Sequence, residues 1–403
     1  MSLESTERWT DVTQAPGESS RLREPGTGLE IRSNCNPDIF SQLQPEWDEL
    51  CARAHVKSPF LECRWFRSWW QAFGKDHQLQ LVTIRRSGQL QGVLPLMLSQ
   101  AWIFGIPCRR LGAISNEHTP RFDFILSDES KQIHQAAWEY LLARQPEWDI
   151  LDLPRLPETS ETLHLLSRFA DERGIRHSIW KKAPGSPWVD MEASWGDYLQ
   201  QRSAGFRKSL RRKFRQLSSA GRYVLETVTE PDAIDQALAD GFQIEAKGWK
   251  NRSKTAIATQ TEALVFYTRL ARDLAETGNL RLHFLALDDK RIAFDYSIFR
   301  HNRLYSLKSG LDIDHAKHSP GTLLLYLILE KAHGEELLEL DLLGTADEFK
   351  MQWTRNTRPN PWLLVYSDSI RGRLLFLLKV RAVPAIKRMI QRFPATMRRK
   401  DQT

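Results

Sequence analysis

The sequence predicts an α/β protein of the α+β kind, with two tandem domains that each contain a mixed, mostly antiparallel sheet flanked by helices. Its 403 residues suit two domains of ordinary size. Hydrophobic residues make up 41% of the chain and charged residues 27%, which is typical of a folded globular protein. Two stretches about 200 residues apart also show the same order of elements, and this repeat is the main argument for a duplication.

Apolar periodicity defines the elements of the first copy. A Ser87-Gly88 turn separates two alternating segments, which predicts a hairpin. The expected elements are, in chain order, a hairpin of residues 79–85 and 91–98, strands at 110–114 and 122–126, a helix at 131–144 and a strand at 148–153.

The second copy repeats this order. Its expected elements are a hairpin of residues 280–287 and 292–299, a strand at 304–311, a helix at 322–333 and a strand at 337–342. Only this copy is expected to follow a long helical region, with helices at 195–220, 231–250 and 261–277 and a strand at 223–228.

The Pro-rich stretch at 184–187 separates the two copies, and we place the domain boundary there. The first thirty residues are polar and rich in Ser, Gly and Pro, which is typical of a disordered arm. The expected organisation is therefore an arm over 1–30, a degenerate copy over 31–183, a complete domain over 184–369 and a basic amphipathic tail over 370–403.

Cysteine usage and hydropathy bear on the compartment. The four cysteines form no Cys-x-x-Cys pair and no Cys/His cluster at zinc spacing, which indicates a reducing compartment and no structural metal. No apolar run could serve as a signal-peptide core or span a membrane. We therefore expect a cytoplasmic protein.

The net charge of +7 is concentrated in the tail. From Asp368 to Thr403, ten Lys or Arg residues stand against two Asp, an excess of eight, so the rest of the chain carries −1. This distribution indicates an anionic partner for the tail and not a footprint for DNA. Because apolar residues are interleaved with the basic ones, the tail is expected either to lie on an anionic membrane face or to pack on the body.

A possible phosphate site follows the strand at 304–311. Ser319 is expected as the N-cap of the next helix, Pro320 at its first position, and Gly321 to keep the first amides accessible. Such a helix start can hold a pyrophosphate, the alternative being merely a well-capped helix. The motifs of dinucleotide binding, P-loops, serine hydrolases and zinc proteases are absent from the sequence.

The order of these motifs resembles the GNAT acyltransferases, which use acyl-coenzyme A. More narrowly, it looks like the branch that contains CelD-like proteins of cellulose biosynthesis, and the Fem peptidyltransferases, which pair two GNAT domains, are more distant relatives. The resemblance covers residues 188–367 well and 40–180 weakly. It is carried by Leu304-Tyr305, Asp312, Ser319-Pro320-Gly321, Leu340-Asp341-Leu342-Leu343-Gly344 and Phe349-Lys350-x-x-Trp353.

The resemblance implies an acyl-CoA co-substrate, in the first place acetyl-CoA, and no metal. The residues that would bind it are Lys317, His318, Ser319, Gly321 and Thr322. Many GNAT phosphate loops have the form Arg/Gln-x-x-Gly-x-Gly/Ala, whereas this stretch has one glycine. The aminoacyl-tRNA used by the Fem group is therefore an alternative donor.

The implied reaction, attack of an amine or hydroxyl on a thioester, needs a general base. We name Asp312 first and His315 second, because they lie near the end of the strand at 304–311, and Asp341 third, at the end of the next strand. Asp312 could instead be a turn or capping carboxylate, His315 an exposed loop histidine, and Asp341 a side chain that holds a loop through backbone N–H groups.

Six further residues are candidates for substrate binding. The resemblance implies that three of them, Tyr305, Lys350 and Trp353, face the acceptor. The alternative for Trp353 is an ordinary core aromatic. Arg207, Arg211 and Arg212 belong to a basic helix and could clamp the phosphates of coenzyme A or of an acceptor. The alternative for this helix is a solvated face.

Together these features predict a cytoplasmic N- or O-acyltransferase that acts on a sugar, polysaccharide or envelope precursor, with peripheral membrane contact through the tail as the alternative location. One alternative is a non-catalytic accessory protein of envelope polysaccharide synthesis. The other is an aminoacyl-tRNA-dependent peptidyltransferase, the one case in which tRNA would be a partner.

Overall fold

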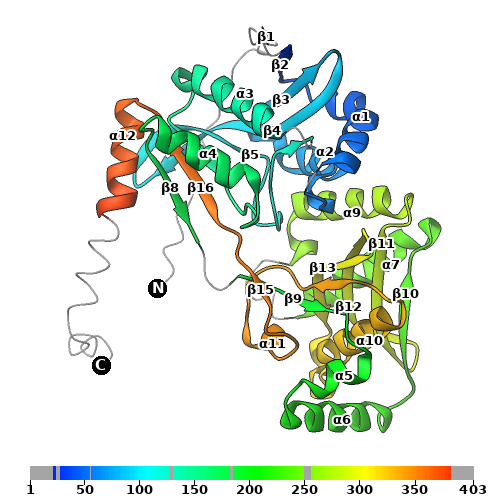
Figure 1. Cartoon of the computed structure of the whole chain (residues 1–403). Coiled ribbons are helices and arrows are strands. Elements are labelled where there is room, and N and C mark those ends of the chain that lie inside the picture. The colour runs from blue at the N-terminus through cyan, green and yellow to red at the C-terminus, as the bar shows by residue number, and fades with distance from the viewer. Residues whose placement is uncertain are drawn as a thin grey trace, which may run out of the picture.

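The structure consists of two lobes (Figure 1). The computed structural model describes residues 21–23, 28–54, 56–127, 130–181, 185–248 and 256–382. The first half of the chain forms the upper lobe in Figure 1, and the last strand and helix, β16 and α12, return to it from the lower lobe.

The sheet of the upper lobe contains nine strands within the described residues. Neighbouring strands run antiparallel, except for β5 and β7, which are parallel. The order is β1 (Arg21–Arg23), β2 (Leu29–Asn34), β3 (Gln78–Arg86), β4 (Gln89–Ile103), β5 (Ile106–Ala113), β7 (Ile150–Leu153), β16 (Trp362–Tyr366) and β8 (His177–Trp180), with β6 (Ile125–Leu126) beside β4. The flanking helices are α1 (Ile39–Arg53), α2 (Cys63–Phe73), α3 (Ser130–Ala143), α4 (Glu161–Glu172) and α12 (Ile370–Phe376).

The sheet of the lower lobe contains seven strands in the part of the chain that is described. Here β13 and β14 are the parallel pair. The order is β10 (Tyr223–Val228), β11 (Leu280–Leu287), β12 (Lys290–Arg300), β13 (Arg303–Leu311), β14 (Glu339–Asp341), β9 (Ser186–Asp190) and β15 (Thr357–Arg358). The helices are α5 (Trp195–Gln200), α6 (Ala204–Ser218), α7 (Ile234–Lys247), α9 (Thr261–Ala275), α10 (Pro320–Gly334) and α11 (Glu348–Met351).

The two sheets confirm the predicted fold class and repeat. Strands β3, β4, β5 and β7 of the upper sheet correspond to β11, β12, β13 and β14 of the lower one. In each, the third strand pairs in parallel with the fourth over three positions, 110–112 with 150–152 and 303–305 with 339–341. The register of the first hairpin also shifts at Ile84/Arg85 in one copy and at Leu285/Ala286 in the other. A hairpin does not require such a shift, so its recurrence supports a duplication.

Helices precede the first copy as well as the second, so the expectation that only the second copy has such a region was wrong. β2, α1 and α2 come before β3, just as β10, α7 and α9 come before β11. Pro45 lies inside α1, and a proline normally ends a helical pattern in sequence. The expected disordered arm over 1–30 is also corrected in part, because Arg21–Arg23 pairs with β2, while the remaining residues before Gly28 lie outside the described residues.

One strand of the segment 184–369 belongs to the sheet of the upper lobe. β9, near the start of this segment, pairs in the lower sheet, where Val189 lies opposite Leu340 of β14. β16 follows the second half, yet Leu364 pairs with Asp152 of β7. The segment 184–369, which we expected as one domain, therefore places its last strand in the upper sheet. A hydrophobic pattern identifies a strand and its buried face but not the sheet in which the strand pairs.

The lobes share a continuous hydrophobic core where α2 lies against α9. The rings of Trp65 and Phe266 pack edge to face with centroids 5.1 Å apart. Beside them, Arg67 Nη2 lies 2.8 Å from Asp273 Oδ2. An aromatic pair of this kind adds about 0.5–1.5 kcal/mol beyond the burial of its area. These contacts fix the position of one lobe against the other, and with it the cavity described below.

Candidate active site

The open edge of β13 is the centre of the candidate site. β13 pairs with β12 as far as Leu311, but it pairs with β14 only from Arg303 to Tyr305. β14 ends at Asp341, and the chain then turns away through Leu343 and Gly344, both at positive φ. The edge of residues 306–311 that faces β14 therefore diverges from it, and six residues of strand span about 20 Å.

The helix α10 begins at the far end of this edge, as predicted, with Pro320 at its first position. Ser319 occupies the N-cap position but adopts a left-handed conformation (φ 53°, ψ 49°), and its side chain makes no capping hydrogen bond. Its carbonyl oxygen instead accepts from the N–H groups of Thr322 and Leu323, at 3.1 and 3.2 Å. Thr322 is thus less open as an amide donor than we expected, and Gly321 provides the first helical N–H, because proline has none.

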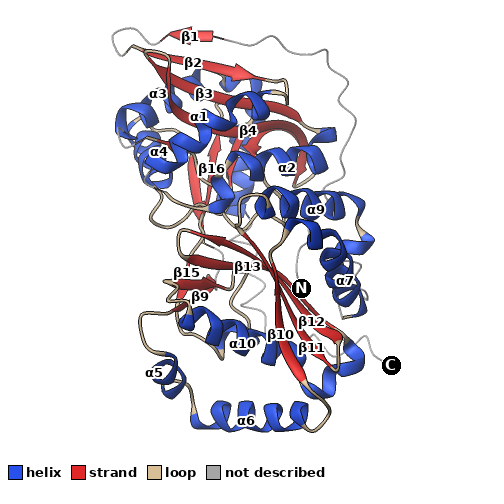
Figure 2. Cartoon of the chain, turned by 90° about the vertical axis from the view of Figure 1, so that its right-hand side faces the viewer, coloured by secondary structure: helices blue, strands red, loops and turns tan. Residues whose placement is uncertain are grey.

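Lys213 of α6 reaches this helix start. Its Nζ donates to the Thr322 hydroxyl at 3.2 Å, and its burial, together with the Arg212 charge, lowers the pKa of the ammonium group. Figure 2 shows α6 at the outer end of the lower lobe, below α10. A half-buried cation and a helix N-terminus therefore lie together where the sequence predicted phosphate binding.

Lys213 was not among the residues predicted from the sequence, although its spacing in α6 contains the signal. It lies three residues after Leu210 and four before Leu217, the two buried positions of α6, and therefore on the inner side of the helix. Arg211 and Arg212 are exposed, whereas Arg207 is half-buried. The Arg207 Nε is buried and has no hydrogen-bond partner among the described residues.

Lys317 and His318 lie in the 3₁₀ helix (Ile313–His318) that joins β13 to α10. Lys317 is exposed and His318 is half-buried. Partial burial and the charges of Lys317 and His315 lower the pKa of His318. The structure thus brings the five predicted phosphate-binding residues together with Lys213 at one helix start.

Asp312 is a capping carboxylate, which is the alternative interpretation made from the sequence. It is buried, its Oδ1 accepts from the Asp314 N–H at 3.1 Å, and its Oδ2 lies 3.2 Å from Lys247 Nζ. Burial alone would raise the pKa of Asp312, but the Asp314 N–H and the ammonium groups of Lys247 and Lys290 hold it below its ordinary value. His315 faces the same carboxylate, with Nδ1 3.6 Å from Oδ2.

Asp341 is an ion-pair partner in the interface of the two lobes. Its side chain is fully buried and contacts Arg121 of the upper lobe and, at 3.2 Å, Arg358. Oδ1 also accepts from the Leu343 N–H at 2.9 Å, which is the loop-holding role that we considered for it. These contacts occupy the carboxylate with structural partners.

The other predicted substrate residues lie in three different environments. Trp353 is fully buried and packs edge to face on Phe206 with centroids 5.0 Å apart, so it is a core aromatic. The Lys350 ammonium donates to the Leu343 carbonyl at 2.8 Å, and it lies next to Gly344 at the end of β14. Tyr305 lines a cavity between the lobes, and burial raises the pKa of its hydroxyl to about 12.

This interlobe cavity has a volume of about 520 Å³. Side chains from both halves line it, including Arg303, Arg358, Trp188 and Tyr305 of the lower lobe and Arg121 and Asp123 of the upper lobe. The Arg358 guanidinium stacks over the Trp188 ring at 4.1 Å from its centroid. Arg303 Nε is 3.7 Å from Glu339, which is beyond a hydrogen bond, so this group can also donate to a ligand.

Asp123 is a cavity residue that the sequence analysis missed. Its Oδ1 accepts from the Phe124 N–H at 2.9 Å. Burial raises the pKa of its carboxyl to about 6, against the opposing effect of the Thr162 and Ser160 hydroxyls. A carboxyl that changes charge near neutrality is suited to proton transfer. No local pattern marks Asp123, because it lies in a loop whose position depends on the packing of the lobes.

The upper lobe has a cavity of about 500 Å³ at the ends of β5 and β7, the strands that correspond to β13 and β14. Gly112, Ser115 and Arg155 are among its lining residues. After β5 the chain runs to β6 without a helix, whereas α10 follows β13 directly after its 3₁₀ turn. The upper copy therefore has no helix start comparable to that of α10 at this place in the described chain.

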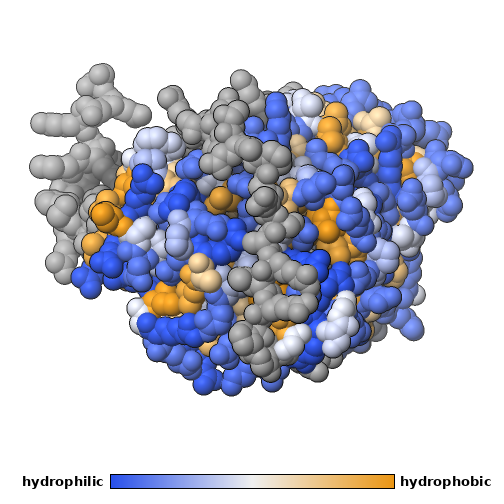
Figure 3. Space-filling view, turned by 90° about the horizontal axis from the view of Figure 1, so that it is seen from above, coloured by the Kyte–Doolittle hydropathy of each residue, from blue (hydrophilic) through white to orange (hydrophobic). Residues whose placement is uncertain are grey.

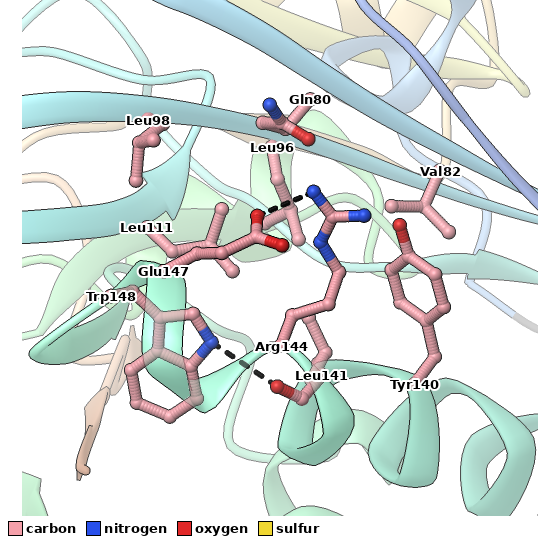
Figure 4. Close-up of a pocket in the computed structure, with 10 residues that line it drawn as sticks. All are labelled: Gln80, Val82, Leu96, Leu98, Leu111, Tyr140, Leu141, Arg144, Glu147 and Trp148. Carbon is pink, nitrogen blue, oxygen red and sulfur yellow. Dashed lines mark hydrogen bonds and ion pairs between the residues drawn. The ribbon is translucent and has the colours of Figure 1, made fainter. Parts of the chain in front are cut away.

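A third cavity lies under α3 (Figure 4). Its volume is only about 10 Å³, and apolar side chains and the Arg144–Glu147 ion pair surround it. One water needs about this much space, so the cavity is a packing void and not a ligand site. Among the residues that the structure describes, we also find no group of three or more His, Cys, Asp or Glu that could hold a metal ion.

Comparison with known proteins relates this geometry to a family. Residues 204–351 match the family model of the acetyltransferase (GNAT) domain, and no curated protein matches the chain significantly. FemX is structurally similar with a TM-score of 0.56 and 12% identity, over 83% of this chain and 98% of FemX.

The C-terminal domain of an Agrobacterium fabrum protein assigned as a lysylphosphatidylglycerol synthetase has a TM-score of 0.50 and 13% identity, over 84% of this chain and 97% of that domain. A tandem GNAT protein from the clavulanic acid biosynthesis pathway has a TM-score of 0.45 and 15% identity, over 85% and 99%. Residues 204–351 of this chain therefore match a GNAT acetyltransferase domain, and the two-lobed fold is similar to that of FemX.

Proposed function

We propose that the chain is an acyltransferase that moves an acyl group, in the first place acetyl, from acyl-CoA to an amine or hydroxyl of a sugar, polysaccharide or envelope precursor. The observation that carries the proposal is the contact of Lys213 with Thr322 at 3.2 Å, which puts an ammonium group at the first turn of α10. A diphosphate there would receive the Lys213 charge, the Gly321 N–H and the positive end of the helix dipole.

The open edge of β13 supports an extended donor. The helix start and Tyr305 lie at opposite ends of residues 305–311, about 20 Å apart along the strand. A donor whose phosphates bind at α10 must carry its acyl group along this edge to reach the interlobe cavity. Coenzyme A has such a long, flexible arm between its diphosphate and its thiol.

The interlobe cavity supports a polar, anionic acceptor. Trp188 and Tyr305 provide flat apolar surfaces, and Arg303, at 3.7 Å from Glu339, provides a cationic donor. A mixture of aromatic surface and a few convergent polar groups is typical of sites that bind small polar molecules. A sugar phosphate or a nucleotide sugar of a polysaccharide precursor would satisfy both features.

Asp123 is the base in this proposal. The ionised carboxylate takes the proton of the acceptor amine or hydroxyl as its nitrogen or oxygen attacks the thioester carbonyl carbon. The carbon–sulfur bond then breaks, and the thiolate leaves as the CoA thiol after protonation. Asp312, His315 and Asp341 were named for this role from the sequence, but Asp312 and Asp341 are occupied by structural partners.

Titration calorimetry with acetyl-CoA and with CoA tests the donor assignment. We expect heat of binding from both ligands in the wild-type protein and weaker binding in a Lys213→Met variant. Wild-type protein that gives no heat with acetyl-CoA, CoA or longer acyl-CoAs would contradict the proposal and favour the non-catalytic accessory function.

The likeness to FemX over nearly the whole chain favours a second candidate, peptidyl transfer from aminoacyl-tRNA. In that case α6 would contact RNA phosphates, and binding would weaken steeply as salt concentration rises. Retention of radiolabelled aminoacyl-tRNA on a filter at low salt, in the absence of CoA binding, would support this candidate over the first.

A further inference from the structure

Exposed apolar side chains gather at one end of the upper sheet. They come from the tip of the β4–β5 hairpin, from α12 and from the turn that directly follows α12, and we call them the hairpin–helix face. Its members are Trp102, Phe104, Ile370, Leu374 and Leu377. Ile370 is 86% exposed and Phe104 51% exposed, so contacts within the described chain do not account for these side chains. Figure 3 shows apolar surface on the left-hand side, the side on which α12 lies in Figure 1.

Asp149 connects the hairpin with the start of α12. Its Oδ2 accepts from the Arg109 N–H at 2.9 Å, and its Oδ1 accepts from the Ser369 hydroxyl, also at 2.9 Å. Ser369 is the N-cap of α12 and accepts from the Gly372 N–H. Because Arg109 is the fourth residue of β5, the hairpin tip and Ile370 lie at the same end of the sheet.

A small cluster of buried residues fixes the hairpin against α12. Ala101 and Cys108 of the hairpin pack with Leu375 of α12, while Ile103 and Phe376 pack at the margin. Leu375 faces inward, whereas Leu374 faces outward. Both elements therefore have a buried side that anchors them and an apolar side that is left open.

Phe104 has an unusual backbone for an aromatic residue. Its φ is 53° and that of Gly105 is 78°, so both central residues of the hairpin turn are left-handed. Such turns favour Asn, Asp and Gly at these positions. A bulky side chain held at positive φ, with its ring exposed, indicates that the ring is retained for a contact outside the chain.

The charges beside α12 are mostly positive. The segment 368–382 contains four basic residues against Asp368, whereas Arg109 and Arg110 of the hairpin are paired with Asp149 and Asp152. Arg371, Arg373 and Arg381 are exposed next to the apolar side chains of α12. Among the described helices, none has both the length and the apolar composition that crossing a bilayer requires.

We propose that the hairpin–helix face binds the surface of an anionic lipid bilayer. Trp102 and Phe104 would enter the boundary between head groups and acyl chains, and α12 would lie in the plane of the interface with Ile370, Leu374 and Leu377 toward the lipid. The flanking arginines would meet the anionic head groups. The charge and the aromatic tip favour this occupant over an apolar protein surface, which would leave the arginines without partners.

Flotation of the full chain with vesicles tests the proposal. We compare phosphatidylcholine vesicles with vesicles that also contain phosphatidylglycerol, and we expect binding only to the second kind. Phe104→Gly should weaken binding about tenfold, because it removes one buried aromatic ring. Arg371→Gln and Arg373→Gln should each weaken binding about fivefold.

Two controls separate loss of contact from loss of folding. Glycine adopts positive φ without strain, so Phe104→Gly should melt at or above the wild-type temperature. Leu264→Ser removes an exposed leucine of α9 in the lower lobe and should bind vesicles like the wild type. The proposal is overturned if the wild type does not float with anionic vesicles, or if Phe104→Gly and Ile370→Ser/Leu374→Ser float as well as the wild type.

Discussion

Arg121 of the upper lobe pairs with the fully buried carboxylate of Asp341 in the lower lobe. The two residues are 220 positions apart, and without Arg121 the buried Asp341 would keep only Arg358 as a cationic partner. Removing one member of a buried pair is far more costly than removing a member of an exposed pair. The pair is therefore a sensitive probe of how the lobes hold together.

Arg121→Ala should lower the free energy of unfolding by about 3 kcal/mol, because it leaves Asp341 buried with Arg358 as its remaining cation. Urea denaturation followed by circular dichroism measures this change. Arg168→Ala, which breaks an exposed pair with Glu172 on α4, is the control and should cost less than about 0.5 kcal/mol. Equal losses in the two variants would show that the interlobe pair is not important for stability.

The raised pKa of Asp123 predicts how the stability of the protein changes with pH. Its pKa is raised from 3.8 to about 6, so the folded protein holds the Asp123 proton more tightly than the unfolded chain does. The protonated Asp123 carboxyl therefore contributes its full stabilisation of the fold below pH 3.8, the pKa in the unfolded chain. This stabilisation is lost as the pH rises through about 6, the pKa in the folded protein. The free energy of unfolding of Asp123→Asn, measured by denaturation at several pH values, should therefore lack this pH dependence between 3.8 and about 6.

The same variant tests the catalytic role of Asp123. The wild-type rate should rise with pH as Asp123 ionises near pH 6. Asp123→Asn should reduce kcat by about 10²- to 10⁴-fold, the usual contribution of a general base. Glu158→Gln changes an exposed acid at the same cavity and should leave kcat within a factor of a few, so similar losses in both variants would argue against a specific role.

Asp312→Asn should lower the stability by about 1 kcal/mol, since it weakens the attraction to the two exposed lysines but retains an oxygen for the Asp314 N–H. Because the pKa of Asp312 is lowered, the stability it contributes is present above its ordinary value of 3.8 and is lost as the pH falls below that value. We expect little change in kcat. A large loss of kcat with an unchanged KM for the donor would instead identify Asp312 as the base.

Lys213→Met should raise the KM for acyl-CoA by about tenfold or more, the effect of losing one charged hydrogen bond to a phosphate. Arg215→Met is a matched control on the same helix, where Arg215 is exposed. Steady-state kinetics with the acyl-CoA concentration varied measure both. An unchanged KM for acyl-CoA in Lys213→Met would contradict the assignment of the α10 helix start as the donor site.

The exposed arginines of α6 can be tested in the same assay. Arg211→Ala/Arg212→Ala should raise the KM for a phosphate-bearing substrate by a few-fold, and added salt should reduce the difference from the wild type because exposed charges are screened. Wild-type kinetics in this double variant would show that Arg211 and Arg212 do not bind substrate and belong to a solvated helix face.

Local pattern was enough to predict most of the elements. The hairpins of both copies, the strand that precedes Asp312 and the helix that begins at Pro320 all lie close to their predicted positions. Alternation and helical spacing depend on which side of one element is buried, and proline acts on its own backbone. These properties can be read from neighbouring residues alone.

The same reasoning did not extend to helices whose pattern is interrupted. α1 contains Pro45, and its partner α2 follows a short 3₁₀ turn, so the helical start of the first copy was missed. For Ser319, the position as an N-cap was predicted but its left-handed backbone was not. That conformation depends on the tight connection of the preceding 3₁₀ helix to α10.

By itself, the sequence determined most elements of the two copies, the repeat of their order and the helix start at Pro320, because local pattern and backbone chemistry identify each of these. Tertiary structure alone decided the sheets in which β9 and β16 pair, the pairing of Arg121 with Asp341, and the approach of Lys213 and Asp123 to the candidate site. These features join residues that lie from about one hundred to more than two hundred positions apart. Their free energy comes from packing between elements that are distant in sequence, and local periodicity carries no information about that packing.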